Sequence, residues 1–184
     1  MDAAHALFYE QGIVASGVDT VVAAAGVSKP TLYAHFGSKS ELVAAVLERR
    51  HARRVASLRA WVADSSDDPR ERLLAVFDWL AEFYGRDGAR GCAFLNAAAE
   101  TPDSGAPARE IIRRQKRWMR GYLAELAGDA GLADPQRVGS QLLLLIDGAS
   151  SRVLVEDGPD EAAEVTAQAR QAATVLIERA VERY

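Results

Sequence analysis

The chain has 184 residues with 49% hydrophobic and 26% charged side chains, and its formal net charge is −4 at pH 7. This length and composition are typical of a globular protein with room for a small domain and a larger one with its own core. A single cysteine excludes a disulfide framework, and no apolar run reaches the roughly 18 residues of a membrane span. The N-terminus lacks a basic stretch followed by an apolar one, so we expect a cytoplasmic protein without a signal peptide.

Two helices are predicted at the start of the chain. The first covers residues 2–12 and is amphipathic. Its inward-facing residues are Ala3, Leu7 and Phe8. Ser16 and Asp19 then have the spacing of a capping box, which predicts that a second helix begins at about residue 18. The apolar face of this second helix holds Val18, Val21, Val22 and Ala25.

A sharp turn and a short third helix follow. Gly26 fits the position after a helix end, where a left-handed backbone is needed, and Val27 is a small apolar side chain that can plug between two helices. Ser28 is a good N-cap, and Pro30 is tolerated in a first helical turn. The residues expected to bury are Leu32 and Phe36. The side chains left on the other faces are Lys29, Thr31, Tyr33 and His35.

The next helix begins within a few residues. Gly37 closes the third helix, and Ser38 with Glu41 forms a capping box for a long helix from Lys39 to about residue 63. At this helix start, the charge of Lys39 and the free backbone N–H groups together suit a phosphate. The second and third helices therefore form a helix-turn-helix unit, which can place one helix in the major groove of DNA.

Three motifs stand close together in this unit. They are Gly26-Val27-Ser28, Thr31-Leu32-Tyr33-Ala34-His35-Phe36 and Ser38-Lys39-Ser40-Glu41-Leu42. With them, residues 2–47 resemble the DNA-binding domain of TetR-family transcriptional regulators. Members of that family usually carry several residues, often basic, before the first helix, whereas this chain begins at Met1 almost inside it. We expect either a start further upstream or the loss of the contacts that such residues make.

The resemblance implies a role for each exposed residue of the third helix. Lys29, Pro30 and Thr31 are expected to face base edges or the groove floor, while Tyr33 and His35 donate hydrogen bonds to phosphates. A partly buried aromatic wedge is the alternative for the latter two. The expected DNA-binding residues are Thr20, Ser28, Lys29, Pro30, Thr31, Tyr33, His35 and Lys39. For Thr20, a plain solvated position is the alternative to a phosphate contact.

The rest of the chain shows helical spacing and little strand signal. A cluster of Ser, Asp and Pro at 65–69 breaks the long helix. Further helices are predicted at 70–86, 92–100, 108–127, 135–156 and 160–183. We therefore predict an all-α fold of about nine helices. A helix-turn-helix DNA-binding domain covers residues 1–47, and a bundle for ligand binding and dimerisation covers residues 48–184.

In this family the bundle holds the site for a small-molecule effector, between helices. The candidate residues are Phe77, Phe83, Tyr84, Phe94, Asn96, Trp118, Tyr122 and Asp147. Ordinary core packing is the alternative for each. Asp147 stands out because a carboxylate in an apolar segment is expensive to bury without a partner. Arg152, or Trp118 and Tyr122 across the bundle, can supply that partner, and a structural hydrogen bond is the favoured interpretation.

Two other features have a simple structural interpretation. Cys92 suggests a redox sensor, but a buried thiol is the more common role of a single cysteine. The basic run in the predicted helix 108–127 is best explained as a solvated helix face, with binding of an anionic ligand as the alternative. Its residues are Arg113, Arg114, Lys116, Arg117 and Arg120.

The last two helices carry stripes of apolar and small residues that predict a homodimer. The stripes consist of Leu142, Leu145, Ala149 and Val153 on one helix, and Val165, Ala169, Ala172, Ala173, Leu176 and Val181 on the other. Two such helices from each subunit can pack as a four-helix bundle. Packing within one subunit is the alternative. A closed dimer places its two reading helices about 34–36 Å apart, which predicts a palindromic operator in double-stranded DNA.

Enzyme motifs are weak in this sequence. Glu48 and His51 have the Glu-x-x-His spacing of di-iron bundles, but the second copy and further glutamates are missing. No phosphate-binding loop, dinucleotide fingerprint or nucleophile elbow is present. We therefore expect no enzyme, cofactor or metal, but a repressor released from its operator by a small molecule. A helical interaction module that does not bind DNA is the alternative, and it leaves Tyr33, His35 and Lys39 unexplained.

Overall fold

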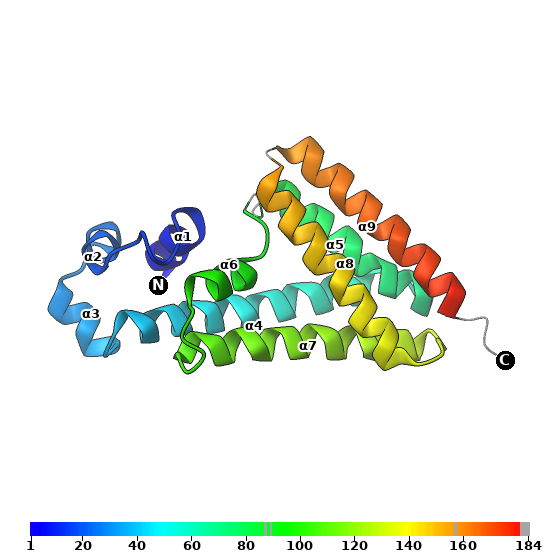
Figure 1. Cartoon of the computed structure of the whole chain (residues 1–184), viewed down its shortest axis with the longest axis horizontal. Coiled ribbons are helices and arrows are strands. Elements are labelled where there is room, and N and C mark those ends of the chain that lie inside the picture. The colour runs from blue at the N-terminus through cyan, green and yellow to red at the C-terminus, as the bar shows by residue number, and fades with distance from the viewer. Residues whose placement is uncertain (87, 89, 157, 181–184) are drawn as a thin grey trace. The chain divides into compact units, whose positions relative to one another are not determined.

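The computed structural model describes residues 1–86, 88, 90–156 and 158–180 (Figure 1). Within these residues every regular element is an α-helix, which confirms the predicted all-α class. The helices are α1 (Asp2–Glu10), α2 (Val18–Ala25), α3 (Lys29–His35), α4 (Lys39–Ser65), α5 (Pro69–Arg86), α6 (Ala93–Glu100), α7 (Pro107–Asp129), α8 (Pro135–Val155) and α9 (Pro159–Ala180). Each predicted helix is found, with ends that differ by only a few residues.

The helices divide into two compact units. The first, here called the head unit, consists of residues 1–54 and 93–115. The second, here called the bundle unit, consists of the described residues within 55–92 and 116–180. Helices α4 and α7 each contribute residues to both units, and the boundary predicted at residue 47 lies inside α4.

The head unit has its own apolar core. Helix α1 buries Ala4 and Phe8, whereas Ala3 and Leu7, which were expected to face inward, are only half-buried. Phe8 is buried as predicted, and the residue that shares its face one turn earlier is Ala4 and not Ala3, because residues four apart lie on the same side of a helix. The other buried apolar residues of α2, α3 and the first turns of α4 are Val21, Val22, Leu32, Leu42, Val43, Val46 and Leu47.

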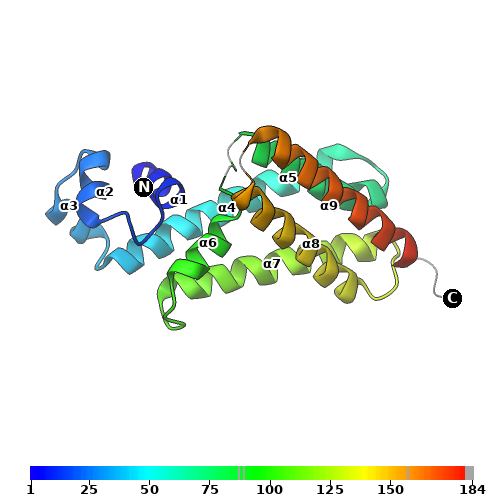
Figure 2. The ribbon, with the colours of Figure 1, turned by 45° about the horizontal axis from the view of Figure 1, so that its top comes forward.

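The bundle unit is built around α5, α8 and α9. In both views α9 lies along α5 and α8 (Figures 1 and 2). Buried side chains from these helices, from α7 and from the second half of α4 form a single cluster, in which each leucine or phenylalanine contributes about 1.5–3 kcal/mol by leaving water. The largest members of this cluster are Phe77, Leu58, Leu73, Leu80, Leu123 and Leu142.

Helix α8 is long and apolar enough to cross a membrane by length and composition. Its apolar residues recur every three or four positions and are buried inside the bundle unit, as in the core helix of a globular protein. These buried residues are Val138, Leu142, Ile146, Ala149 and Val153. Packing within the chain therefore accounts for this face of α8, while Leu144, Leu154 and Val155 of the same helix are exposed.

The two predicted capping boxes have different outcomes. Ser16 does not cap α2, whose N-cap is Gly17, because the Ser16 hydroxyl donates instead to the backbone carbonyls of Leu7 (3.2 Å) and Gly12 (2.7 Å). Ser38 does act as predicted, since its hydroxyl accepts the backbone N–H of Glu41 at 3.1 Å.

The close packing of α7 against α8 depends on a glycine. A Cβ atom added at Gly139 would lie 2.7 Å from the backbone nitrogen of Ala124 and 2.9 Å from the carbonyl oxygen of Arg120. Both neighbours are backbone atoms of α7, so neither can rotate away. A larger residue at this position must push the two helices apart.

We therefore expect Gly139→Ala to lower the free energy of unfolding by about 1–3 kcal/mol, because the added methyl group overpacks the α7–α8 contact. Chemical denaturation of the purified protein measures this change. Gly121→Ala is the matched control, since a Cβ there meets nothing within 4 Å, and alanine in an exposed helix should stabilise by about 0.5–1 kcal/mol. Equal effects at both positions would contradict the packing argument.

Candidate functional site

The short helix α3 is held at both ends by local hydrogen bonds. Gly26 adopts a left-handed backbone with φ 66° and ψ 30°, which ends α2 as predicted. The N–H groups of Gly26 and Val27 return to the carbonyls of Ala23 and Val22, so the last turn of α2 is satisfied. Ser28 lies three residues after Ala25, the last residue of α2. Its side chain accepts the backbone N–H of Thr31 at 3.2 Å and caps the start of α3.

The structure places the predicted DNA-binding residues of α3 on its outward side. Leu32 is the buried residue of this helix, with Phe36 half-buried just after it. The exposed residues are Thr20 on α2 and Ser28, Lys29, Pro30, Thr31, Tyr33 and His35. Tyr33 is 47% exposed and lies outside the buried core of the head unit. Val27 is also exposed and does not plug the turn as expected.

Lys29 has a partner that the sequence analysis missed. Its Nζ atom lies 2.7 Å from Oδ1 of Asp19 on α2, and both side chains remain exposed to solvent. The hydrogen bond to Asp19, and then the charge of the same carboxylate, raise the pKa of Lys29. Asp19 was assigned to a capping box, and its position ten residues before Lys29 gave no signal of this contact.

Lys39 lies at the first turn of α4, where a phosphate contact was predicted. Its Nζ atom donates to the backbone carbonyl of Ile13 at 2.5 Å. The neighbouring Val14 N–H donates to Oε2 of Glu100, the last residue of α6, at 2.8 Å. The loop between α1 and α2 is thus held from two sides, by α4 and by α6. We call these two contacts the loop clamp.

Glu48 and His51 of the weak di-iron pattern do not act together. Glu48 is paired with Arg114 of α7, whereas His51 is buried with its ring edge-on to Phe94. Burial lowers the pKa of His51. In the described part of the chain, no group of three His, Cys, Asp or Glu side chains is placed to hold a metal ion.

The predicted effector residues are divided between the two units. Phe94 and Asn96 lie on α6 in the head unit, and the other six lie in the bundle unit. Phe77 is fully buried among core side chains. The Tyr84 hydroxyl is 2.5 Å from the Ser150 hydroxyl, which links α5 to α8. The remaining aromatic residues pair face to face, Phe83 with Trp79 and Trp118 with Tyr122.

Asp147 has a charged partner, though a different one from those predicted. Its Oδ1 lies 2.5 Å from Nζ of Lys116 on α7, whereas Arg152 is bound to Glu156 and Gln168. Lys116 therefore differs from the four arginines of the basic run, which are exposed as expected. Cys92 is buried, with its Sγ 4.0 Å from the same Lys116 ammonium.

The bundle unit also has an open cavity of about 230 Å³, bordered by α4, α5 and α7. Of the predicted effector residues, only Tyr122 lines it. The guanidinium of Arg59 lies over the Tyr122 ring, 5.3 Å from its centre, and also approaches Glu125 at 3.9 Å. Burial raises the pKa of the Tyr122 hydroxyl. The charged residues lining the cavity are Arg59, Arg72, Glu125 and Asp129.

The stripes predicted to form a dimer surface belong largely to the core. Leu142, Ala149, Val153, Val165 and Ala173 are buried within the bundle unit, and Val181 lies outside the described residues. Leu145, Ala169 and Leu176 are half-buried, and Ala172 is exposed. A different apolar set faces solvent on α8 and α9. It consists of Leu144, Leu154, Val155 and Val175, with exposures of 72%, 40%, 78% and 49%.

Comparison with known proteins agrees with this geometry. Residues 1–46 match the family model described as bacterial regulatory proteins, tetR family. Over nearly the whole chain (97%), the structure is similar to a solved tetR-type transcriptional regulator from Streptomyces avermitilis, with 35% sequence identity, 94% coverage of that chain and a TM-score of 0.83. The chain belongs to the TetR family. A TetR-family regulator from Streptomyces coelicolor is also similar, at 29% identity and a TM-score of 0.84, over 98% of this chain and 93% of the other.

Curated relatives of this TetR-family chain match over shorter stretches. The transcriptional activator FasR of Mycolicibacterium smegmatis is 40% identical over 85 residues, 46% of this chain and 38% of FasR. The transcriptional repressor ComR of Escherichia coli is 32% identical over 130 residues, 68% of this chain and 62% of ComR. The matched part thus spans between about two-fifths and three-fifths of these relatives. Members of the TetR family are regulators and not enzymes, which agrees with the separate environments of Glu48 and His51.

The pair formed by Lys29 and Asp19 gives a prediction for DNA binding. Asp19→Asn removes a carboxylate beside α3 and frees Lys29 for contact with DNA, so the affinity for DNA should rise roughly two- to fivefold. Fluorescence anisotropy with DNA from around the chain's own gene measures this. Asp64→Asn removes the same charge outside the head unit and should leave affinity nearly unchanged. A weaker Asp19→Asn complex would mean that Asp19 orients Lys29 instead of competing for it.

Proposed function

We propose that the chain is a homodimeric repressor that binds a palindromic operator in double-stranded DNA and is released when a small molecule binds the bundle unit. The observation that carries this proposal is the exposed face of α3, where the polar residues face solvent and Leu32 anchors the helix to the core. The repressor ComR matches the longer stretch of this chain, while the activator FasR matches a shorter one. A regulator of this kind acts in the cytoplasm, in contact with the chromosome.

Helix α3, here called the reading helix, can bind DNA by two kinds of contact. The side chains of Lys29 and Thr31 lie in its first turn, from which recognition helices contact base edges. Tyr33 and His35 offer hydrogen-bond donors to phosphate oxygens, which fix the position of the helix without reading sequence. Pro30 carries no donor or acceptor in its side chain, so direct reading of bases falls to its two neighbours.

The dimer is supported by the apolar side chains that α8 and α9 leave in solvent. Leu144 and Val155 are among the most exposed apolar residues of the chain, and Val175 on α9 adds to them. A group of apolar side chains that faces solvent on neighbouring helices is typical of a protein–protein interface. A twofold pairing through these helices uses the same patch on both subunits and predicts a palindromic operator.

The effector site is proposed at the open cavity that borders Tyr122. Its lining combines an aromatic ring with charged side chains of both signs, which gives a ligand apolar contact as well as a few directional partners. A ligand shifts the protein between two states only if it binds one of them more tightly. In the head unit the loop clamp connects α6 and α4 to the loop that precedes α2, so movement of either helix changes the position of the reading helix.

Two substitutions in the head test the DNA-binding proposal. Tyr33→Phe removes one hydrogen bond to a charged phosphate and should weaken operator binding about tenfold, with little change in its salt dependence. Lys39→Gln removes a charge and should reduce the slope of log affinity against log salt by about one unit. Anisotropy titrations at several salt concentrations separate the two effects. Wild-type protein without any sequence-selective DNA binding would instead favour the helical interaction module.

The proposed dimer can be tested by placing a charged side chain in its interface. Leu144→Glu in both subunits should convert the dimer to a monomer, because each interface would then bury two carboxylates without partners. Sedimentation velocity of the purified protein measures the mass. Ala60→Glu, on an exposed position of α4, is the matched control and should remain dimeric. A Leu144→Glu protein that stays dimeric would place the interface elsewhere.

A further inference from the structure

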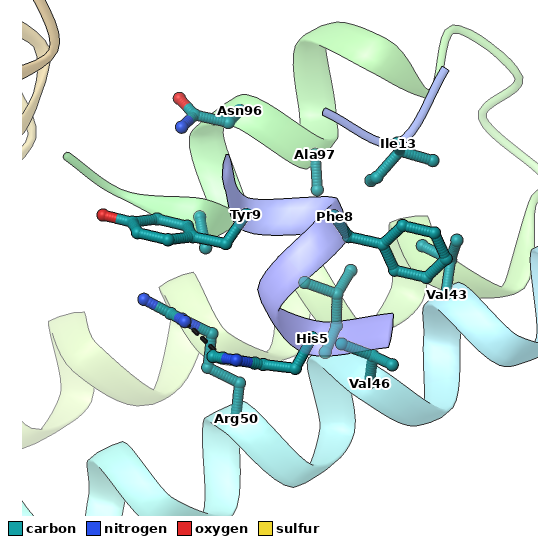
Figure 3. A pocket seen from close by; sticks show the side chains of 11 residues that line it. His5, Phe8, Tyr9, Ile13, Val43, Val46, Arg50, Asn96 and Ala97 are labelled. Atoms are coloured by element: carbon teal, nitrogen blue, oxygen red, sulfur yellow. Dashed lines mark hydrogen bonds between the residues drawn. The ribbon is translucent and has the colours of Figure 1, made fainter. Parts of the chain in front are cut away.

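A partly buried polar contact joins α1 to α4 in the head unit and has no part in the proposed function. Arg50 is only 8% exposed, and its Nη1 lies 2.5 Å from Nε2 of His5. Figure 3 shows the two side chains side by side, joined by the dashed line. The guanidinium also lies over the ring of Tyr9, 4.5 Å from its centre. Two residues of α1 therefore bind the same arginine of α4.

The contact with Arg50 requires His5 to be neutral. A guanidinium has only donors, so Nε2 of His5 must accept, and the ring proton must then be on Nδ1. Protonation would convert this acceptor into a donor and place a second positive charge beside the first. The hydrogen bond would be lost, and the two cations would repel each other.

The other charged groups around His5 add to this repulsion. Arg49 and Arg53 of α4 lie on the same side, and Asp2 is bound to them at 2.7 and 3.8 Å. From α6 the neighbouring lining residues are Ala93, Asn96 and Ala97, none of which titrates. Three arginines and one carboxylate thus act on His5. Burial, followed by the charges of Arg50 and Arg53, lowers the pKa of His5, while Asp2 acts in the opposite direction.

The space beside the pair does not compensate a charged imidazole. The pocket that His5 and Arg50 border has a volume of about 20 Å³, which is room for about one water molecule. Among the described residues its lining contains no carboxylate, and much of it is apolar. Figure 3 shows Phe8, Val43 and Val46 on the side of α1 and α4 that faces this space. A protonated His5 can therefore regain a good environment only by moving away from Arg50.

We propose that His5 and Arg50 form a pH-sensitive latch, which holds α1 against α4 while His5 is neutral and releases α1 when His5 is protonated. Protons bind more tightly to the open state, so acidification below the ordinary histidine pKa of 6.5 favours opening. At higher pH His5 is neutral in both states, and the latch contributes its full stability. Because α1 packs against α2, opening removes support from the reading helix. The latch itself does not depend on DNA binding.

Hydrogen exchange of the full-length protein tests the latch. Between about pH 7.5 and about pH 5, after correction for intrinsic exchange rates, the opening constant of α1 amides should rise by up to about tenfold per pH unit. Amides of α8 should show a much smaller change. His5→Gln is the key variant, because a glutamine oxygen can accept from Arg50 but cannot be protonated in this range, so its α1 exchange should be independent of pH.

Two controls separate the latch from other histidines. His35→Gln changes an exposed histidine and should keep the full pH response of α1, and so should His51→Gln if that variant folds. Equal pH dependence in wild type and His5→Gln, or none in wild type, would overturn the latch. A second measurement needs no substitution. In wild-type protein, NMR of the His5 ring nitrogens reports the protonation of His5, and the backbone amide shifts of α1 should change over the same pH range. Protonation of His5 without a change in the α1 amide shifts would also overturn the proposal.

Discussion

The geometry of the head unit depends on the abrupt reversal of the backbone between α2 and α3. Gly26 takes a left-handed conformation there, and the N–H groups of Gly26 and Val27 return to carbonyls of α2. A Cβ at this glycine would meet nothing within 4 Å, so the constraint is conformational and not steric. Ser28 then satisfies the start of α3. Because only three residues separate the helices, this turn fixes the direction in which α3 presents its side chains.

The loop that precedes α2 is fixed by contacts from much later parts of the chain. Lys39 holds the carbonyl of Ile13, Glu100 holds the N–H of Val14, and the Ser16 hydroxyl closes the loop on its own backbone. These groups would otherwise bind water, so their net contribution to stability is modest, at about 1 kcal/mol each. Their importance is geometric. They connect α6 and α4 directly to the loop that precedes α2.

Local features of the fold could be predicted from the sequence, and contacts between helices could not. Ser28 and Ser38 act within three residues of their own positions, so spacing alone identified these caps. Ser16 has the same spacing to Asp19, but its hydroxyl donates to the carbonyl of Gly12 in the preceding loop and does not cap α2. The partner of Asp147 is Lys116, 31 residues earlier, and helical periodicity does not reveal which helices meet. For the same reason the bounds of α3 could be predicted from local spacing, whereas the predicted effector residues lie in two different units.

The positive charges of the head are engaged within the protein, which changes what DNA binding must achieve. Lys29 is bound to Asp19, Lys39 to a carbonyl, and Arg50 to two residues of α1. A DNA group at Lys29 or Lys39 therefore replaces an existing partner and does not simply neutralise a free charge. Such exchange lowers affinity but keeps each side chain close to the orientation it needs, so less conformational freedom is lost on binding. The net charge of −4 is compatible with a DNA-binding head, because the local placement of a few cations matters more for DNA binding than the net charge of the whole chain.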